Sequence, residues 1–124
     1  QPALRDCLGP TTHAAGGMAY VRLHGRNAAA WFASDRPAFE RYNYLYSEAE
    51  LREWVQRVNA LLGEARDVYV FANNHYQGQG PVNALELRAL VTRQRVAVPA
   101  PLLAAYPRLA AVATPAPPAA LFEM

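Results

Sequence analysis

Polar and cationic side chains gather at two places in this sequence, each at the end of a short apolar run. The first is Tyr20-Val21-Arg22-Leu23-His24-Gly25-Arg26-Asn27, and the second is Val68-Tyr69-Val70-Phe71-Ala72-Asn73-Asn74-His75. Imidazole groups exchange protons near neutral pH, and polar groups that converge at strand ends are typical of ligand sites. We therefore predict acid/base roles for His24 and His75.

The predicted ligand-binding residues combine cations, aromatic rings and amides. Guanidinium groups bind phosphate through paired hydrogen bonds, and aromatic rings stack on a base or a sugar. The same residue types also have structural uses, because aromatic rings fill the cores of loops and an interior Arg binds carbonyls or a carboxylate. The predicted set is Arg22, Arg26, Asn27, Trp31, Arg41, Tyr42, Tyr44, Asn73 and Asn74.

Other kinds of site are less well supported by the sequence. His24 and His75 would make a metal pair only with further carboxylates or histidines, and neither motif contains one, so we predict no metal site here. All 12 basic residues are Arg, which excludes a Schiff-base lysine or a phosphate-loop lysine from this chain. The sequence also lacks a nucleophile elbow and the glycine pattern of a dinucleotide-binding site. No motif therefore identifies a cofactor, and the cofactor is unknown.

The elements that must position these residues are two strands, each followed by a helix. Residues 18–24 alternate between polar and apolar side chains, which predicts a strand with one buried face. Residues 67–73 are apolar on both faces, as expected of a strand in a parallel sheet that helices cover. The aromatic residues 27–46 between them predict a structured loop that folds over the strand end.

Two helices follow these strands. Ser47 and Glu50 fit a capping box that begins a helix with Leu51, Trp54 and Val58 on its apolar stripe. Pairs four residues apart, Glu48 with Arg52 and Glu53 with Arg57, are expected on its wet side. A second helix is predicted over residues 81–93, with Ala84, Leu87, Leu90 and Val91 buried, and a third over residues 101–113, interrupted at Pro107.

Composition sets the boundaries and the compartment. Residues 1–17 predict a loop or linker, residues 18–95 the two strand-helix units, and residues 96–124 a helix and an Ala/Pro-rich tail.

The prolines and Arg108 in the last region argue against a membrane helix. The single Cys7 excludes an internal disulfide, which favours a cytoplasmic protein, and the net charge of +2 gives no global case for nucleic acid. A chain that begins at Gln1 suggests a processed or truncated product.

The two strand motifs, with Arg41-Tyr42-Asn43-Tyr44-Leu45-Tyr46-Ser47 between them and Asn83-Ala84 after them, resemble the YecE-like family, the domain of unknown function 72. The resemblance covers residues 20–90. It implies an α/β fold, a TIM-like (β/α)8 barrel of which this chain is the C-terminal strand-helix units, and hence a fragment. Asn43 departs from the pattern, since relatives often have Asp there, and this removes a carboxylate from the loop.

A barrel of that kind needs eight strands and about 250 residues. The expected partners are therefore the remainder of the barrel or a second copy of the chain, together with a phosphorylated small molecule or nucleic acid. Three functional hypotheses remain open: a hydrolase or isomerase-like enzyme that binds a phosphate-bearing ligand, a non-catalytic nucleic-acid-binding module, and an inactive fragment with an incomplete site.

Overall fold

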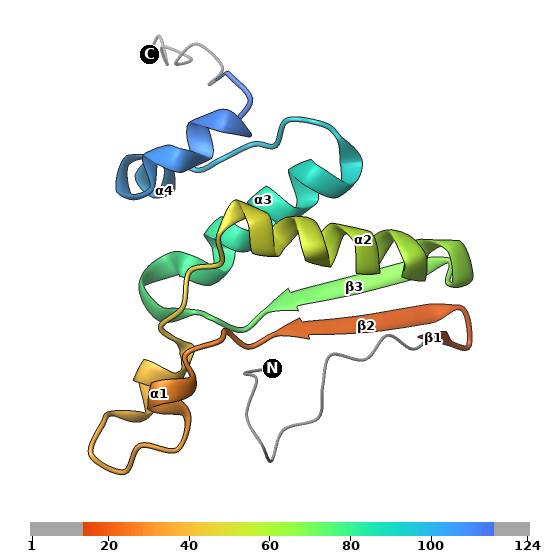
Figure 1. Ribbon diagram of the computed structural model, residues 1–124. Helices are drawn as coiled ribbons and strands as arrows, with labels where there is room; N and C mark the ends of the chain where they lie inside the picture. The colour runs from red at the N-terminus through yellow and green to blue at the C-terminus, as the bar shows by residue number, and fades with distance from the viewer. Residues whose placement is uncertain (1–13, 116–124) are drawn as a thin grey trace, which may run out of the picture.

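The computed structural model describes residues 14–115, in which helices pack against one face of a small sheet (Figure 1). The sheet has the strand order β1-β2-β3. The expectations for Cys7 and for the part of the Ala/Pro-rich tail after Pro115 concern residues outside this range. The elements are β1 Ala14–Ala15, β2 Met18–Leu23, α1 Ala28–Trp31, α2 Glu48–Glu64, β3 Asp67–Ala72, α3 Gln79–Thr92 and α4 Ala100–Ala105, with the 3-10 turns η1 Ala38–Tyr42, η2 Tyr76–Gly78 and η3 Pro107–Ala111.

Strands β2 and β3 are parallel, as their sequences predict, with Tyr20 opposite Tyr69 and Arg22 opposite Phe71. Side chains of β2 alternate strictly, so that Val21 and Leu23 lie in the core under the helices. The other face carries Tyr69 and Phe71, which are 51% and 49% exposed. The described elements therefore cover only one face of β3, although its sequence is apolar on both.

Strand β1 lies within a region that the sequence predicts as loop. Gly16 and Gly17 have φ of +62° and +79°, the left-handed conformations that a tight hairpin turn requires. The turn brings Ala14 opposite Ala19 in an antiparallel pair. The turn at the two adjacent glycines thus gives β2 a second neighbour in the sheet, where the sequence predicted only loop.

Helix α2 begins where its capping box predicts. The Ser47 hydroxyl accepts a hydrogen bond from the Glu50 N–H, and the Glu50 carboxylate accepts one from the Ser47 N–H. The buried face carries Leu51, Trp54, Val58 and Leu61. Glu48 pairs with Arg52 as expected, whereas Glu53 pairs with Arg26, and the Arg57 guanidinium lies over the Trp54 ring.

Helix α3 has a broader buried face than its apolar residues predict. Leu87 is buried as expected, but Ala84 is exposed, and the polar Asn83 and Glu86 are buried beside Val82. Further on, α4 and η3 are separated near Pro107, as predicted. Within residues 14–115, no helix is both long and apolar enough to cross a membrane.

Candidate functional site at the ends of two parallel strands

The carboxyl ends of β2 and β3 are held together just beyond the last residues of both strands. The Asn73 N–H donates to the Leu23 carbonyl at 2.7 Å, which extends the ladder by one bond and places His24 beside Asn73. The chain then turns at Gly25, whose φ is +90° and whose N–H donates to the Tyr46 hydroxyl at 2.9 Å. A turn of this kind favours glycine because other residues rarely adopt a positive φ.

Asn73 contacts both predicted acid/base residues. Its side-chain Nδ2 lies 3.2 Å from Nδ1 of His24, and its backbone oxygen lies 3.0 Å from Nδ1 of His75. His24 is half-buried and His75 is exposed. The structure therefore brings the two histidines, one from each strand motif, to a single asparagine, His24 at its side chain and His75 at its backbone carbonyl.

Aromatic rings from the segment after β2 connect the same two histidines. The ring centroids of His24 and Trp31 are 6.2 Å apart, those of Trp31 and Tyr42 are 6.0 Å apart, and those of Tyr42 and His75 are 4.9 Å apart. The first two contacts are edge-to-face, an arrangement that aromatic quadrupoles favour. The expected fold of this segment over the strand end is thus observed. We call His24, Trp31, Tyr42, Asn73 and His75 the strand-end cluster.

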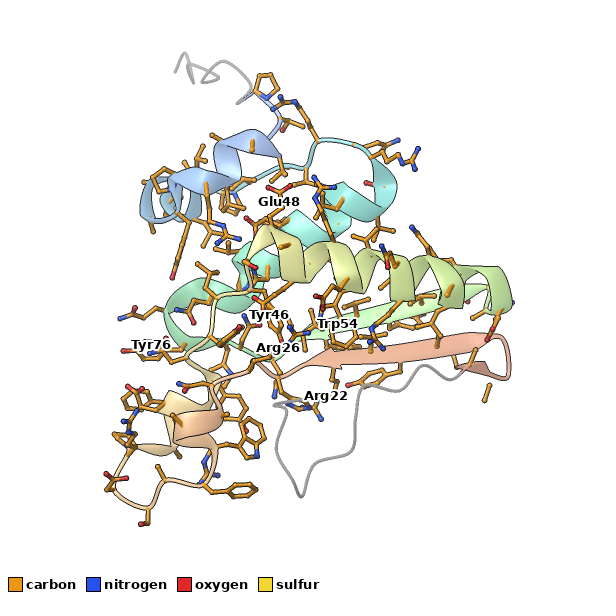
Figure 2. All side chains as sticks on the ribbon, in the orientation of Figure 1. Arg22, Arg26, Tyr46, Glu48, Trp54 and Tyr76 are labelled. Atoms are coloured by element: carbon orange, nitrogen blue, oxygen red, sulfur yellow. The ribbon has the colours of Figure 1, made fainter. Side chains whose placement is uncertain are left out.

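Arg26 is engaged by carboxylates of α2. Its guanidinium lies 2.9 Å from Oε1 of Glu50 and 3.4 Å from Oε2 of Glu53. Burial would lower the pKa of Arg26, but the carboxylates of Glu50 and Glu53 raise it overall, so the guanidinium group stays charged. Figure 2 shows Arg26 near Tyr46, where the chain passes from the β2 end to the start of α2.

Three more of the predicted ligand-binding residues also make intramolecular contacts. Asn27 donates to the carbonyls of Glu40 and Asn43, at 2.8 and 3.3 Å. Asn74 is fully buried and donates to the Tyr44 carbonyl at 2.7 Å. The Tyr44 hydroxyl donates to Glu50 at 2.7 Å. A ligand would have to displace these contacts, so the geometry favours positioning roles for Arg26, Asn27, Tyr44 and Asn74.

Arg22 and Arg41 differ from Arg26, because neither forms an ion pair with any residue in the range 14–115. Arg22 is exposed and lies on the side of β2 opposite α2 (Figure 2), whereas Arg41 is half-buried in η1. On the same face as Arg22, the rings of Tyr20 and Phe71 lie 4.9 Å apart. Among the contacts of residues 14–115, these two guanidinium groups are the cations of the predicted set without an ion-pair partner.

The local electrostatics favour neutral tyrosine and imidazole and a charged Glu50. Burial and the hydrogen bond to Glu50 raise the pKa of Tyr44 to about 12. Burial, followed by the nearby Arg22, lowers the pKa of His24. Burial alone would raise the pKa of Glu50, but hydrogen bonds from Tyr44 and Ser47 and the charge of Arg26 lower it overall.

A buried polar network behind the cluster was not predicted from the sequence. The Asn83 side chain accepts from Tyr46 N–H at 2.9 Å and donates to the Tyr46 carbonyl at 3.1 Å and to Glu86 at 3.0 Å. Arg108 binds Glu86 at 2.6 Å and also donates to the Tyr46 carbonyl at 2.8 Å. The available signal was Asn83 and Glu86 three residues apart on the inner face of α3, flanked by apolar residues.

The sequence matches the family described as protein of unknown function DUF72 over residues 2–107, a range that contains the whole strand-end cluster. The chain belongs to the DUF72 family. It is 34% identical over 74 residues to the UPF0759 protein YunF of Bacillus subtilis strain 168, a match that covers 57% of this chain and 26% of that protein.

Two solved DUF72 structures resemble the fold. A family protein from Thermotoga maritima is 39% identical, with a TM-score of 0.56, and the match covers 61% of this chain and 28% of the other. A family protein from Enterococcus faecalis is 30% identical, with a TM-score of 0.58, and the match covers 67% of this chain and 30% of the other. The DUF72 chain thus matches little more than a quarter of the length of these relatives.

Two clefts in this DUF72 chain lie away from the strand-end cluster. One, of about 480 Å³, is lined mainly by apolar residues of β3, α2 and α3. The other, of about 520 Å³, lies among the start of α2, α3 and the η3 region. No residue of the cluster lines either cleft. Within residues 14–115 there is also no group of three or more His, Cys, Asp and Glu side chains arranged to hold a metal.

Proposed function

We propose that this DUF72 chain binds a phosphate-bearing ligand with a planar ring at the carboxyl ends of β2 and β3. The observation that carries the proposal is the strand-end cluster, in which two histidines, two aromatic rings and an amide from separate segments meet beside two parallel strands. Ligands of α/β proteins commonly bind at the carboxyl ends of parallel strands.

Each group in this proposal has a chemical role. Arg22 and Arg41 bind the phosphate, because both have unpaired guanidinium groups among the described residues, while Trp31 and Tyr42 contact the planar ring. His24 and His75 are the acid/base groups. A site of this composition suits a hydrolase or an isomerase-like reaction, in which a proton moves while an anionic group stays fixed.

The architecture that we propose around the site is a (β/α)8 barrel, completed by the remainder of the polypeptide or by a second copy of the chain. The face of the sheet opposite the helices supports this, since Met18, Tyr20, Tyr69 and Phe71 are each about half exposed there, at 53%, 59%, 51% and 49%. Such a large exposed apolar surface normally marks an interface. The matches include only 26% to 30% of the length of the relatives, so in those proteins most of the chain lies outside the matched part and is available to pack on this face. With one cysteine, Cys7, we propose a cytoplasmic location.

Isothermal titration with adenosine monophosphate tests the binding proposal, with adenosine and inorganic phosphate as partial ligands. Arg22→Gln and Arg41→Gln should each weaken binding by about tenfold or more, since a hydrogen bond to a charged group contributes about 1.5–3 kcal/mol and about 1.4 kcal/mol is a factor of ten. Arg36→Gln is the matched control, because Arg36 is exposed in the segment between α1 and η1. Equal affinities for all three variants would overturn the assignment. Light scattering on the same samples gives the native mass and tests for a second copy.

Nucleic-acid binding without catalysis is the second candidate, and the exposed ring of Phe32, at 67%, favours it. Phe32 follows α1 directly and lies near Arg36 in the sequence, a combination that suits a stacked base next to a backbone phosphate. In this case the affinity for a short single strand should fall steeply with salt, and Phe32→Ala should weaken it. A site for a small ligand predicts instead that Phe32→Ala leaves the affinity for adenosine monophosphate unchanged.

A further inference from the structure

We propose that Asn73 fixes His24 and His75 in opposite neutral tautomers, so that the pair presents one hydrogen-bond donor and one acceptor to the ligand. That the two imidazoles contact a ligand rests on the proposed function, whereas their tautomers follow from the contacts of Asn73. Two histidines in the same tautomer would present two donors or two acceptors.

The backbone of Asn73 determines the tautomer of His75. Nδ1 of His75 lies 3.0 Å from the Asn73 carbonyl oxygen, which has no proton to give. A hydrogen bond therefore requires the proton on Nδ1 of His75. In the neutral ring Nε2 is then unprotonated. Because His75 is exposed, this nitrogen can accept a proton or a hydrogen bond.

The side chain of Asn73 determines the tautomer of His24. Nδ2 of the amide carries two protons and no free lone pair, and it lies 3.2 Å from Nδ1 of His24. Nδ1 of His24 must therefore accept, which places the ring proton on Nε2. A protonated imidazole could not accept this bond, and the half-buried position together with the nearby Arg22 disfavours the protonated form.

The direction of the strand explains why Asn73 and not its neighbour makes these contacts. Successive side chains of an extended chain point to opposite faces, so Asn73 lies on the face of Arg22 and His24 while Asn74 points into the core. Asn74 is accordingly fully buried against Tyr44 and Asn83. The two adjacent asparagines thus make different contacts: Asn73 contacts the two histidines, and Asn74 contacts Tyr44 and Asn83 in the core.

A phosphate-bearing ligand with a neighbouring hydroxyl suits this pair. Nε2–H of His24 donates to a phosphate oxygen, and Nε2 of His75 accepts from the hydroxyl. Neutral histidines provide this arrangement without an additional charge, because Arg22 and Arg41 already supply the cations. Asn73 is in this account a positioning residue, since it acts on the ligand through both rings.

Nitrogen-15 NMR of the full 124-residue chain, labelled at histidine, tests the tautomers without any ligand. Long-range proton–nitrogen correlations at neutral pH show which ring nitrogen carries the proton, and His→Gln variants at positions 13, 24 and 75 assign the three signals. We expect His24 protonated at Nε2 and His75 protonated at Nδ1. The same tautomer in both residues would overturn the proposal.

Asn73→Asp provides a test by a single-atom change. A carboxylate can only accept, so His24 should change to the Nδ1–H tautomer and its pKa should rise by about one unit or more, while His75, bound to the backbone, should keep its tautomer. Asn59→Asp on the exposed surface of α2 makes the same charge change and should alter neither ring. An unchanged His24 in a folded Asn73→Asp chain would also overturn the proposal. Should that variant fail to fold, the wild-type tautomers still decide.

Addition of adenosine monophosphate to the same labelled sample separates this inference from the proposed function. Opposite tautomers with no response of either imidazole to the ligand would refute the site assignment and leave the role of Asn73 intact. Identical tautomers with a clear response would refute the role of Asn73 and leave the ligand site intact. Opposite tautomers together with shifts of both Nε2 signals are the result expected if both hold.

Discussion

Asn83→Ala should destabilise the fold more than its single missing amide suggests, because Asn83 makes four buried hydrogen bonds. It accepts from Tyr46 N–H and from Asn74 at 2.9 Å each, and it donates to the Tyr46 carbonyl at 3.1 Å and to Glu86 at 3.0 Å. The Tyr46 carbonyl and Glu86 also bind Arg108, and Asn74 also binds the Tyr44 carbonyl. The Tyr46 N–H has no other partner among the described residues.

The expected loss in unfolding free energy follows from this inventory. One buried N–H left without a partner costs about 1–3 kcal/mol, and the three bonds whose partners keep another contact cost together roughly 1.5–3 kcal/mol at the lower end of the usual range. Alanine regains up to about 0.7 kcal/mol of helix propensity in α3. The net loss is about 3 kcal/mol, a large part of the roughly 5–15 kcal/mol by which domains are stable.

Urea unfolding followed by tryptophan fluorescence measures this loss, because Trp54 is 6% exposed in the core. With a denaturant dependence of about 1.5 kcal/mol per molar, the midpoint should fall by roughly 2 M. Asn59→Ala on the exposed surface of α2 is the control and should leave the midpoint unchanged or slightly higher. A fall of less than roughly 0.5 M for Asn83→Ala would refute the view that this network holds the Tyr46 segment on α3.

Two further predictions concern the turn and the cap beside the strand-end cluster. Gly25→Ala should lower the unfolding free energy by about 2 kcal/mol or more, because its φ is +90° and the new Cβ would lie 2.9 Å from Cβ of Tyr44. Gly16→Ala, also at positive φ but with nothing within 4 Å, should cost less, and equal urea midpoints for the two variants would contradict the steric argument. Glu50 has a pKa below its ordinary value of 4.5, so its stabilising contribution is present above that pH and is lost as the pH falls through the lower folded value. Glu50→Gln should therefore lower the midpoint at pH 7 and reduce its decrease toward pH 3, and an unaltered pH profile would be evidence against the contribution of Glu50.

The regular elements followed from local signals in the sequence. The alternation of residues 18–24 predicted β2, and the apolar run of residues 67–73 predicted a parallel β3. The Ser47 and Glu50 pair located the start of α2 to the residue. Gly16 and Gly17 carried a hairpin signal that was assigned to a linker, and only the pairing of Ala14 with Ala19 shows the turn. Local patterns specify elements, but a two-residue strand depends on its partner.

The convergence of His24, Asn73 and His75 was predictable from the sequence, whereas the contacts of the other predicted residues were less so. His24, Asn73 and His75 meet because both strands end at the same edge of the sheet, which their sequences indicated. The engagement of Arg26 by Glu50 and Glu53 depends on how α2 lies across the turn, and spacing along the chain does not contain this. The four-residue spacing predicted an ion pair between Glu53 and Arg57, but Glu53 instead pairs with Arg26, which lies far from it in the sequence.

A crystal structure of the chain with adenosine monophosphate would show whether the nucleotide binds at the strand-end cluster. We expect the phosphate within hydrogen-bond distance of Arg22 and Arg41, the purine ring against Trp31 and Tyr42, and both imidazoles in contact with the ligand. A nucleotide bound in the apolar cleft between β3 and the helices, or one that leaves the strand-end cluster untouched, would contradict this expectation.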